Sequence, residues 1–206
     1  MVMKKAMSLF LLLLIAPLLV NTQTIENLDY ISPFHDGFAA VKKDNLWAFI
    51  NTNGEIVINF RNDLVATNSE DGNYPIFIEG KCLIEKKIDG ISYYGFIDTS
   101  GKIVVTPQFL NVSNYLNNVA LAIILRKEVL GKNEVLNKNL ISYKYYEVSI
   151  DSKGNIIKYL SPKGVVVVID KNHTLKTPKI TSKRISENLC AVIDDNNQWA
   201  LVKVIE

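Results

Sequence analysis

Three aspartates recur at similar places in the chain and could act together as acid–base or hydrolytic groups. Asp98 and Asp151 each follow Ile in an Ile-Asp-x-x-Gly sequence, and Asp170 does so in a weaker version. Carboxylates contributed by separate loops are the groups that a glycoside hydrolase needs. Asn51 fills the same place in an earlier copy, which suits a hydrogen-bonding role better than a requirement for charge. Because Asp and Asn both bond their own backbone two residues on, the pattern indicates turns.

Other candidates for catalysis or metal binding are isolated. His35 and His173 have no partner at metal-ligand spacing. The oxygen-rich stretches 70–73 and 194–197 do not fit the twelve-residue calcium loop. No G-x-S-x-G sequence and no glycine-rich phosphate loop occurs. We therefore expect no catalytic residue, no metal site and no cofactor, and we expect the protein not to be an enzyme.

One local cluster combines aromatic and basic side chains. It consists of Tyr143, Lys144, Tyr145 and Tyr146. An ordinary strand with tyrosines on both faces explains it. A contact surface is the alternative, because Tyr is enriched where proteins meet partners. These four residues are the predicted partner contacts.

The first residues have the layout of a secretory signal peptide. Met1–Lys5 is basic, Ala6–Val20 is largely apolar and Asn21–Gln23 is polar. We expect a signal peptide over residues 1–22 and export to the periplasm, the cell surface or the medium. An uncleaved N-terminal anchor is the alternative. No other apolar run approaches the length of a membrane span, so no transmembrane segment is expected in the mature chain.

The expected mature chain carries almost no net charge. The leader contains two of the 23 basic residues, Lys4 and Lys5, which leaves 21 basic and 21 acidic residues. A nucleic-acid-binding protein usually has a clear basic excess. Nucleic acid is therefore not an expected partner.

The stretch Tyr94–Phe109, YGFIDTSGKIVVTPQF, has the pattern of a β-hairpin. Asp98 and Gly101 suit a tight turn. The β-branched run from Ile103 suits a strand, and Pro107 ends it because proline cannot donate to a ladder. This hairpin predicts the architecture of the remaining chain.

Parts of the hairpin recur along the sequence. The Ile-Asp-x-x-Gly turn returns, and an aromatic residue followed by a small one appears as Trp47-Ala48, Tyr94-Gly95 and Trp199-Ala200. An apolar residue, a polar turn and a short strand precede most copies. The predicted copies cover residues 34–60, 78–109, 116–160 and 165–206 of one domain over residues 25–206.

These copies predict an all-β fold of tandem hairpins stacked in an elongated or curved array. A small propeller-like ring is the alternative. The third copy contains an insertion, expected to be a long hairpin or loop over Arg126–Asn139. The polar stretch Arg61–Pro75 is the other irregular segment. Such insertions in repeat proteins tend to lie on one face, which is often the binding face.

The order apolar-x-Glu-Gly, strand, Trp-Gly, Ile-Asp-x-x-Gly, strand, Pro-x-Phe resembles the WG (KWG) repeat of bacterial proteins. Ile78–Phe109 matches it best. The departures are Ala48 and Ala200 at the Gly position, Phe60 at the Pro position, and Glu147 at the aromatic position of the third copy. The family is largely of unknown function, so the resemblance implies the repeat fold and no catalytic residues.

The alignment of the copies also accounts for the cysteines. Cys82 and Cys190 align with Ala39 and Ala120, at a small strand position, and free Cys behaves as a small buried hydrophobe. The sequence thus predicts an exported, non-enzymatic β-repeat protein that binds a protein or glycan at the cell envelope. A structural scaffold or accessory protein is the alternative, and a hydrolase with loop carboxylates is the third reading.

Overall fold

The computed structural model describes residues 25–69, 71–161, 163–169, 176–194 and 196–204. The predicted signal peptide, Asp170 and His173 lie outside these residues. The strands are β1 (Tyr30–Ile31), β2 (Phe38–Lys43), β3 (Leu46–Asn51), β4 (Ile56–Arg61), β5 (Thr67–Ser69), β6 (Gly72–Tyr74), β7 (Lys81–Ile88), β8 (Ile91–Asp98), β9 (Ile103–Val112), β10 (Ala120–Asn133), β11 (Lys138–Ile150), β12 (Ile156–Tyr159), β13 (Val165–Val167), β14 (Lys183–Arg184), β15 (Leu189–Ile193) and β16 (Trp199–Lys203).

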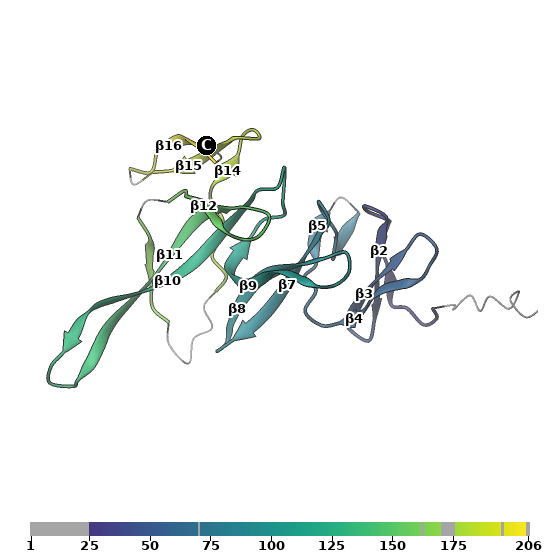
Figure 1. Cartoon of the computed structure of the whole chain (residues 1–206), viewed down its shortest axis with the longest axis horizontal. Coiled ribbons are helices and arrows are strands. Elements are labelled where there is room, and N and C mark those ends of the chain that lie inside the picture. The colour runs from purple at the N-terminus through teal and green to yellow at the C-terminus, as the bar shows by residue number, and fades with distance from the viewer. Residues whose placement is uncertain (1–24, 70, 162, 170–175, 195, 205–206) are drawn as a thin grey trace, which may run out of the picture.

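These strands form four antiparallel sheets, and within the described part of the chain none closes into a barrel and no helix is present. The sheet orders are β1-β2-β3-β4, β5-β6, β7-β8-β9-β10-β11-β12 with β13 beside β11, and β14-β15-β16. Figure 1 shows an open, elongated series of sheets. The predicted all-β array of hairpins is confirmed. Among the described residues there is no helix with the length and apolar character needed to cross a bilayer.

The same strand pairing is used four times. The partners are Ala39↔Ile50, Cys82↔Ile97, Ala120↔Ile150 and Cys190↔Val202. The small residue of each pair is at most 1% exposed. Both cysteines are free, and burial raises the pKa of the Cys82 thiol to about 12. The predicted burial of the two cysteines at the alanine position is confirmed.

The recurrent Asp and Asn side chains hold turns. The Asp98 Oδ1 atom accepts hydrogen bonds from the backbone N–H groups of Ser100 (2.9 Å) and Lys102 (3.0 Å), and Gly101 has φ +82°. This is a type I turn followed by a left-handed residue, a common three-residue hairpin loop. Asn51 and Asp151 accept the same pair of bonds from residues two and four positions on.

A fourth turn of this kind lies at Asp194, between β15 and β16. The Asp194 Oδ1 atom accepts from the N–H groups of Asn196 and Gln198, both at 2.9 Å. Asn197 takes the left-handed conformation, with φ +61°, because Asn tolerates it better than most residues. Sequence comparison missed this turn because Asn replaces the glycine.

Aromatic residues join successive repeats. The rings of Phe49 and Phe77 have centroids 4.6 Å apart, and those of Phe96 and Tyr115 are 4.9 Å apart. Phe77 and Tyr115 hold the same position, five residues before Cys82 and Ala120. Each joint lies in its own cluster of buried apolar side chains. The core is therefore a series of joints between neighbouring repeats, as expected for a stacked array.

The third joint is built differently, because Ser149 stands where Phe49 and Phe96 stand in the earlier repeats. Glu147, two residues before it, makes polar contacts instead. Glu147 is 7% exposed, and its carboxylate accepts four hydrogen bonds from the segment that leads into the last sheet. The donors are the backbone N–H and hydroxyl groups of Thr181 (2.8 and 2.7 Å) and of Ser182 (2.9 and 2.5 Å). Full pairing makes burial of this charge tolerable. The predicted fourth copy, 165–206, includes β13, which pairs with β11 of the third repeat, and the separate sheet β14-β15-β16.

Candidate binding arm and its hollow

The hairpin of β10 and β11 continues far beyond the length that a repeat requires. In the second repeat the equivalent hairpin closes at Ile88↔Ile91. The matching pair in the third repeat is Arg126↔Lys144, yet pairing continues to Asn133↔Lys138. We call residues 127–143 the arm. Figure 1 shows it projecting from the body, and at about 3.4 Å per residue its strands add roughly 20 Å.

The predicted insertion is therefore a long hairpin, and its strands are regular except for one bulge. The register shifts between Val129 and Gly131, so Leu130 is the extra residue on its strand. A glycine at such a place suits a bulge and disfavours a helix. The sequence predicts this hairpin correctly as one of its two options.

The arm exposes aliphatic side chains. They are Val129, Leu130, Val135, Leu136, Leu140 and Ile141. Val135 and Leu136, at the tip between the strands, are 93% and 65% exposed. Each buried side chain of this type would contribute about 1.5–3 kcal/mol relative to exposure. A group of exposed apolar residues on one element marks an interaction site more often than scattered ones do.

A hollow of about 640 Å³ lies at the base of the arm. Its lining is mainly apolar and comes from the β7-β8 hairpin, the β10-β11 hairpin and the segment after β13: Ile88, Asp89, Ile91, Tyr93, Leu125, Tyr143 and Ile169. Leu125 and Val129 point to the same face of β10, because side chains alternate along a strand. Their ladder partners Tyr145 and Ile141 share that face, as does the pair Lys127 and Tyr143 between them. The apolar surface thus continues from this arm-base hollow onto the arm.

The four predicted partner contacts divide between two faces of β11. Tyr143 lines the arm-base hollow, and Tyr145 packs beside Ile91 and Ile123 under the same face. Lys144 and Tyr146 lie on the opposite face, where both bind Glu128: the Lys144 Nζ atom is 2.7 Å from Oε2, and the Tyr146 hydroxyl donates to Oε1 at 3.1 Å. Because the cluster is split, the structure brings only Tyr143 to the hollow.

The ion pair on the opposite face shifts the pKa values of Glu128 and Lys144 in the directions expected for opposite charges. The hydrogen bond from Lys144, with that from Tyr146, lowers the pKa of Glu128, and the same bond raises the pKa of Lys144. Inside the hollow, burial raises the pKa of the Tyr93 phenol, and the nearby charge of Asp89 acts in the same direction. At neutral pH the Tyr93 phenol in the hollow is therefore uncharged.

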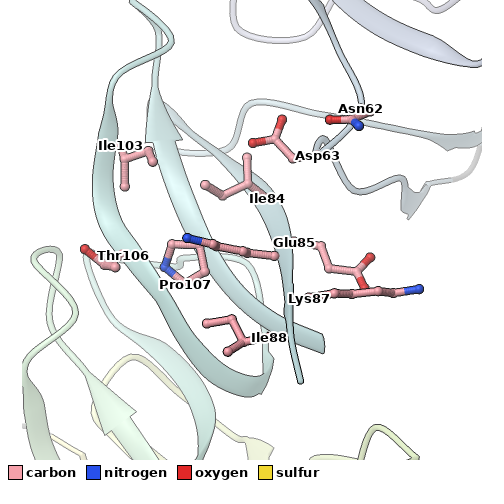
Figure 2. Close-up of a pocket in the computed structure, with 10 residues that line it drawn as sticks. Asn62, Asp63, Ile84, Glu85, Lys87, Ile88, Ile103, Thr106 and Pro107 are labelled. Carbon is pink, nitrogen blue, oxygen red and sulfur yellow. The ribbon is translucent and has the colours of Figure 1, made fainter. Parts of the chain in front are cut away.

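A second hollow, of about 620 Å³, lies where the first and second repeats meet, and Figure 2 shows its lining. It contains two carboxylates, Asp63 and Glu85, as a hydrolase would require. Asp63 accepts two bonds from Arg61, at 2.5 and 2.8 Å, and Glu85 accepts one from Ser92. In Figure 2 the two carboxylates point in different directions. We call this the junction hollow.

His35 is engaged in the packing of the first repeat. Its Nε2 atom lies 2.9 Å from the hydroxyl of buried Tyr74. Across the described residues, no three His, Cys, Asp or Glu side chains gather where they could hold a metal ion.

Sequence reasoning missed most of the arm-base hollow. Tyr93 and Leu125 are 32 positions apart and meet only because β8, β9 and β10 are adjacent. The signal available beforehand was the surplus of Val and Leu in the predicted insertion, residues 126–139. Aliphatic residues are unusual in a segment that only reverses the chain.

The family model of the WG containing repeat matches residues 25–47, 47–82 and 94–124. No curated protein and no solved structure matches the chain. Two of the matched units contain a whole joint, since 47–82 includes Phe49 with Phe77 and 94–124 includes Phe96 with Tyr115. Each of these two units thus runs from the second strand of one repeat's hairpin, β3 or β8, into the first strand of the next repeat, β7 or β10. This protein is a WG repeat-containing protein.

Proposed function

We propose that this chain is an exported, non-enzymatic β-repeat protein that binds a protein partner at the cell envelope through its arm. The carrying observation is the arm itself, with six aliphatic side chains exposed on a projecting hairpin. The leader-like residues at the start of the sequence support export.

Stacking of the repeats does not require the arm. The second repeat packs on its neighbours with a hairpin closed by Asp89-Gly90, two residues that both take positive φ. Type I′ turns of this kind give the shortest hairpins. The third repeat has 17 residues, 127–143, where the second repeat has two. This surplus contributes little to the core, which favours a role outside folding.

The carboxylates support a role in binding over one in hydrolysis. Asp98 and Asp151 accept backbone bonds that hold turns. Asp63 is paired with Arg61, and Glu85 with Ser92. A glycosidase needs one carboxylic acid and one carboxylate facing a common bond, and these four side chains serve other contacts.

A glycan is the second candidate ligand. Tyr93 and Tyr143 both line the arm-base hollow, and an aromatic side chain offers an apolar face with a polar hydroxyl at its edge. Such a ligand would use the hollow and not the tip of the arm. The two candidates therefore differ in the residues they require.

The test is to replace residues 127–143 by Asp-Gly, so that Arg126 and Lys144 close a hairpin like that of β7 and β8. We expect this trimmed variant to fold with a Tm close to that of the parent and to lose the envelope proteins that the parent captures. Untagged parent should compete for that capture. Equal capture by the trimmed variant would refute the proposal.

The glycan alternative predicts a different pattern. Binding to envelope polysaccharide would persist in a variant with Val135→Asp and be lost on Tyr93→Ala. If neither variant changes any interaction, and the parent captures neither protein nor polysaccharide, a structural scaffold is the better account.

A further inference from the structure

The arm and the hollow at its base are complementary, and one chain carries both. The tip presents two aliphatic side chains, Val135 and Leu136. The arm-base hollow is lined by aliphatic and aromatic side chains and encloses about 640 Å³. A site of a few hundred Å³ with an apolar lining suits side chains of this size and kind.

A single chain cannot bring its own tip to its own base, because the hairpin ladder between them is continuous from Ala120↔Ile150 to Asn133↔Lys138. Two chains can. If two arms lie face to face and antiparallel, each tip reaches the base of the other arm, because the two arms have the same length. A two-fold axis makes both contacts identical.

The face of the arm suits such packing. Val129, Ile141 and Tyr143 lie on the face that continues from the hollow, and Val129 and Ile141 are 61% and 39% exposed. Two sheet faces pack about 10 Å apart when apolar side chains fill the space between them. The bodies of the two copies would then lie at opposite ends of the pair of arms, since each arm projects from its body (Figure 1).

Charge is also complementary in this arrangement. The tip of the arm carries Lys132, Glu134 and Lys138, a net charge of +1, and Asp89 lines the hollow. When a tip enters the hollow of another copy, its lysines approach that carboxylate. Opposite charges at the rim of an interface favour the correct register and raise the association rate.

We infer that the protein partner of the arm is a second copy of this chain, bound as a two-fold dimer with antiparallel arms. This inference rests on the proposed function and names the partner that it leaves open. In this dimer each tip occupies the other copy's hollow. Both the mass of the dimer and these contacts can therefore be tested.

The first test is sedimentation velocity of the purified chain from about 1 to about 100 µM, the range in which a moderate-affinity dimer dissociates. We expect a monomer–dimer equilibrium. The double variant Val135→Asp, Leu136→Asp should raise the dimer dissociation constant at least about tenfold, the equivalent of 1.4 kcal/mol. Ile103→Asp is the control, since Ile103 is 49% exposed and is not part of the arm or of the lining of the arm-base hollow.

The second test places the tip in the hollow. Chains with Leu136→Cys are mixed with chains with Ile88→Cys and mildly oxidised; the native cysteines are buried. We expect a disulfide between the two kinds of chain, and far less when Ile103→Cys replaces Ile88→Cys. A monomer at every concentration, or equal cross-linking by the control, would overturn the inference.

The outcomes separate this inference from the proposed function. If the chain stays monomeric while the arm still captures another envelope protein, the second copy is not the partner and the proposed function stands. If trimming the arm changes neither mass nor capture, both are wrong.

Discussion

The ring of Phe77 packs on the ring of Phe49 at 4.6 Å, although the two residues belong to successive repeats. Phe49 lies on β3, and Phe77 lies in the segment that leads into β7. Both are 1% exposed. Tyr115 repeats the contact on Phe96, so one type of joint holds the first three repeats together.

This joint predicts that alanine substitutions at two equivalent phenylalanines differ greatly in their effect on stability. Phe77→Ala would leave a cavity between the first two repeats and should lower the free energy of unfolding by about 3–5 kcal/mol. Phe34 holds the same position in the first repeat and is 49% exposed, so Phe34→Ala should cost less than about 1 kcal/mol. Urea denaturation of both variants measures the difference. Similar losses for the two would argue against the joint.

The glycine after the aromatic residue is required in the second repeat. An added Cβ on Gly95 would lie 2.3 Å from the carbonyl oxygen of Val105 and 2.6 Å from the nitrogen of Pro107. The chain approaches this closely because Val105–Phe109 of β9 spans only Tyr94–Phe96 of β8, which leaves a wide bulge. In the first repeat the bulge is one residue shorter, and alanine stands at the equivalent position.

Gly95→Ala should therefore lower the free energy of unfolding by at least about 2 kcal/mol, because backbone atoms would have to move. The reverse change at the matched position, Ala48→Gly, should cost only about 0.5–1 kcal/mol through chain entropy. Thermal and urea unfolding of the two variants show which of them loses more stability. The explanation fails if Gly95→Ala is the milder of the two.

The aspartates of the turns predict that the stability of the fold depends slightly on pH and decreases towards acidic pH. The hydroxyl of Ser100 is the largest cause that lowers the pKa of Asp98, and backbone N–H bonds add to it. A lowered pKa means that the stabilisation is present at neutral pH and is lost as the pH falls through the folded-state value. Asp98→Asn should keep the turn, because Asn51 already makes the same bonds, and should flatten this part of the acid profile.

Asp98→Ala removes the acceptor and should lower the Tm below that of Asp98→Asn at neutral pH. Melting curves of the three proteins from neutral to acidic pH give the comparison. Asp98→Asn and Asp98→Ala losing equal stability would show that the side-chain oxygen does not hold the turn.

Local patterns in the sequence predict the elements of this fold well. Turns at Asp98 and Asp151, the burial of Cys82 and Cys190, and the long hairpin after Arg126 depend on neighbouring residues or on repetition. A four-residue turn and an alternating strand leave a direct signal in the sequence. The fold class follows from their number and order.

Features that depend on distant partners leave no such signal. Glu147 departs from the repeat pattern, and only the approach of Thr181 and Ser182 explains why a carboxylate is tolerated there. The face on which each of Tyr143 and Tyr146 lies depends on the register of β10 with β11. A shift of one residue would exchange the two faces. The sequence therefore identifies the cluster but does not show which of its residues share a face.

The most direct measurement of the central claim compares the arm with the junction hollow as the binding surface. Val135→Asp changes the tip of the arm, and Ile103→Asp changes the hollow of Figure 2. Both are solvent-exposed, so both variants should fold with the parent's Tm. The account predicts that the affinity for the captured partner falls at least about tenfold, or 1.4 kcal/mol, for Val135→Asp and stays unchanged for Ile103→Asp. Loss of affinity with Ile103→Asp and full affinity with Val135→Asp would contradict it.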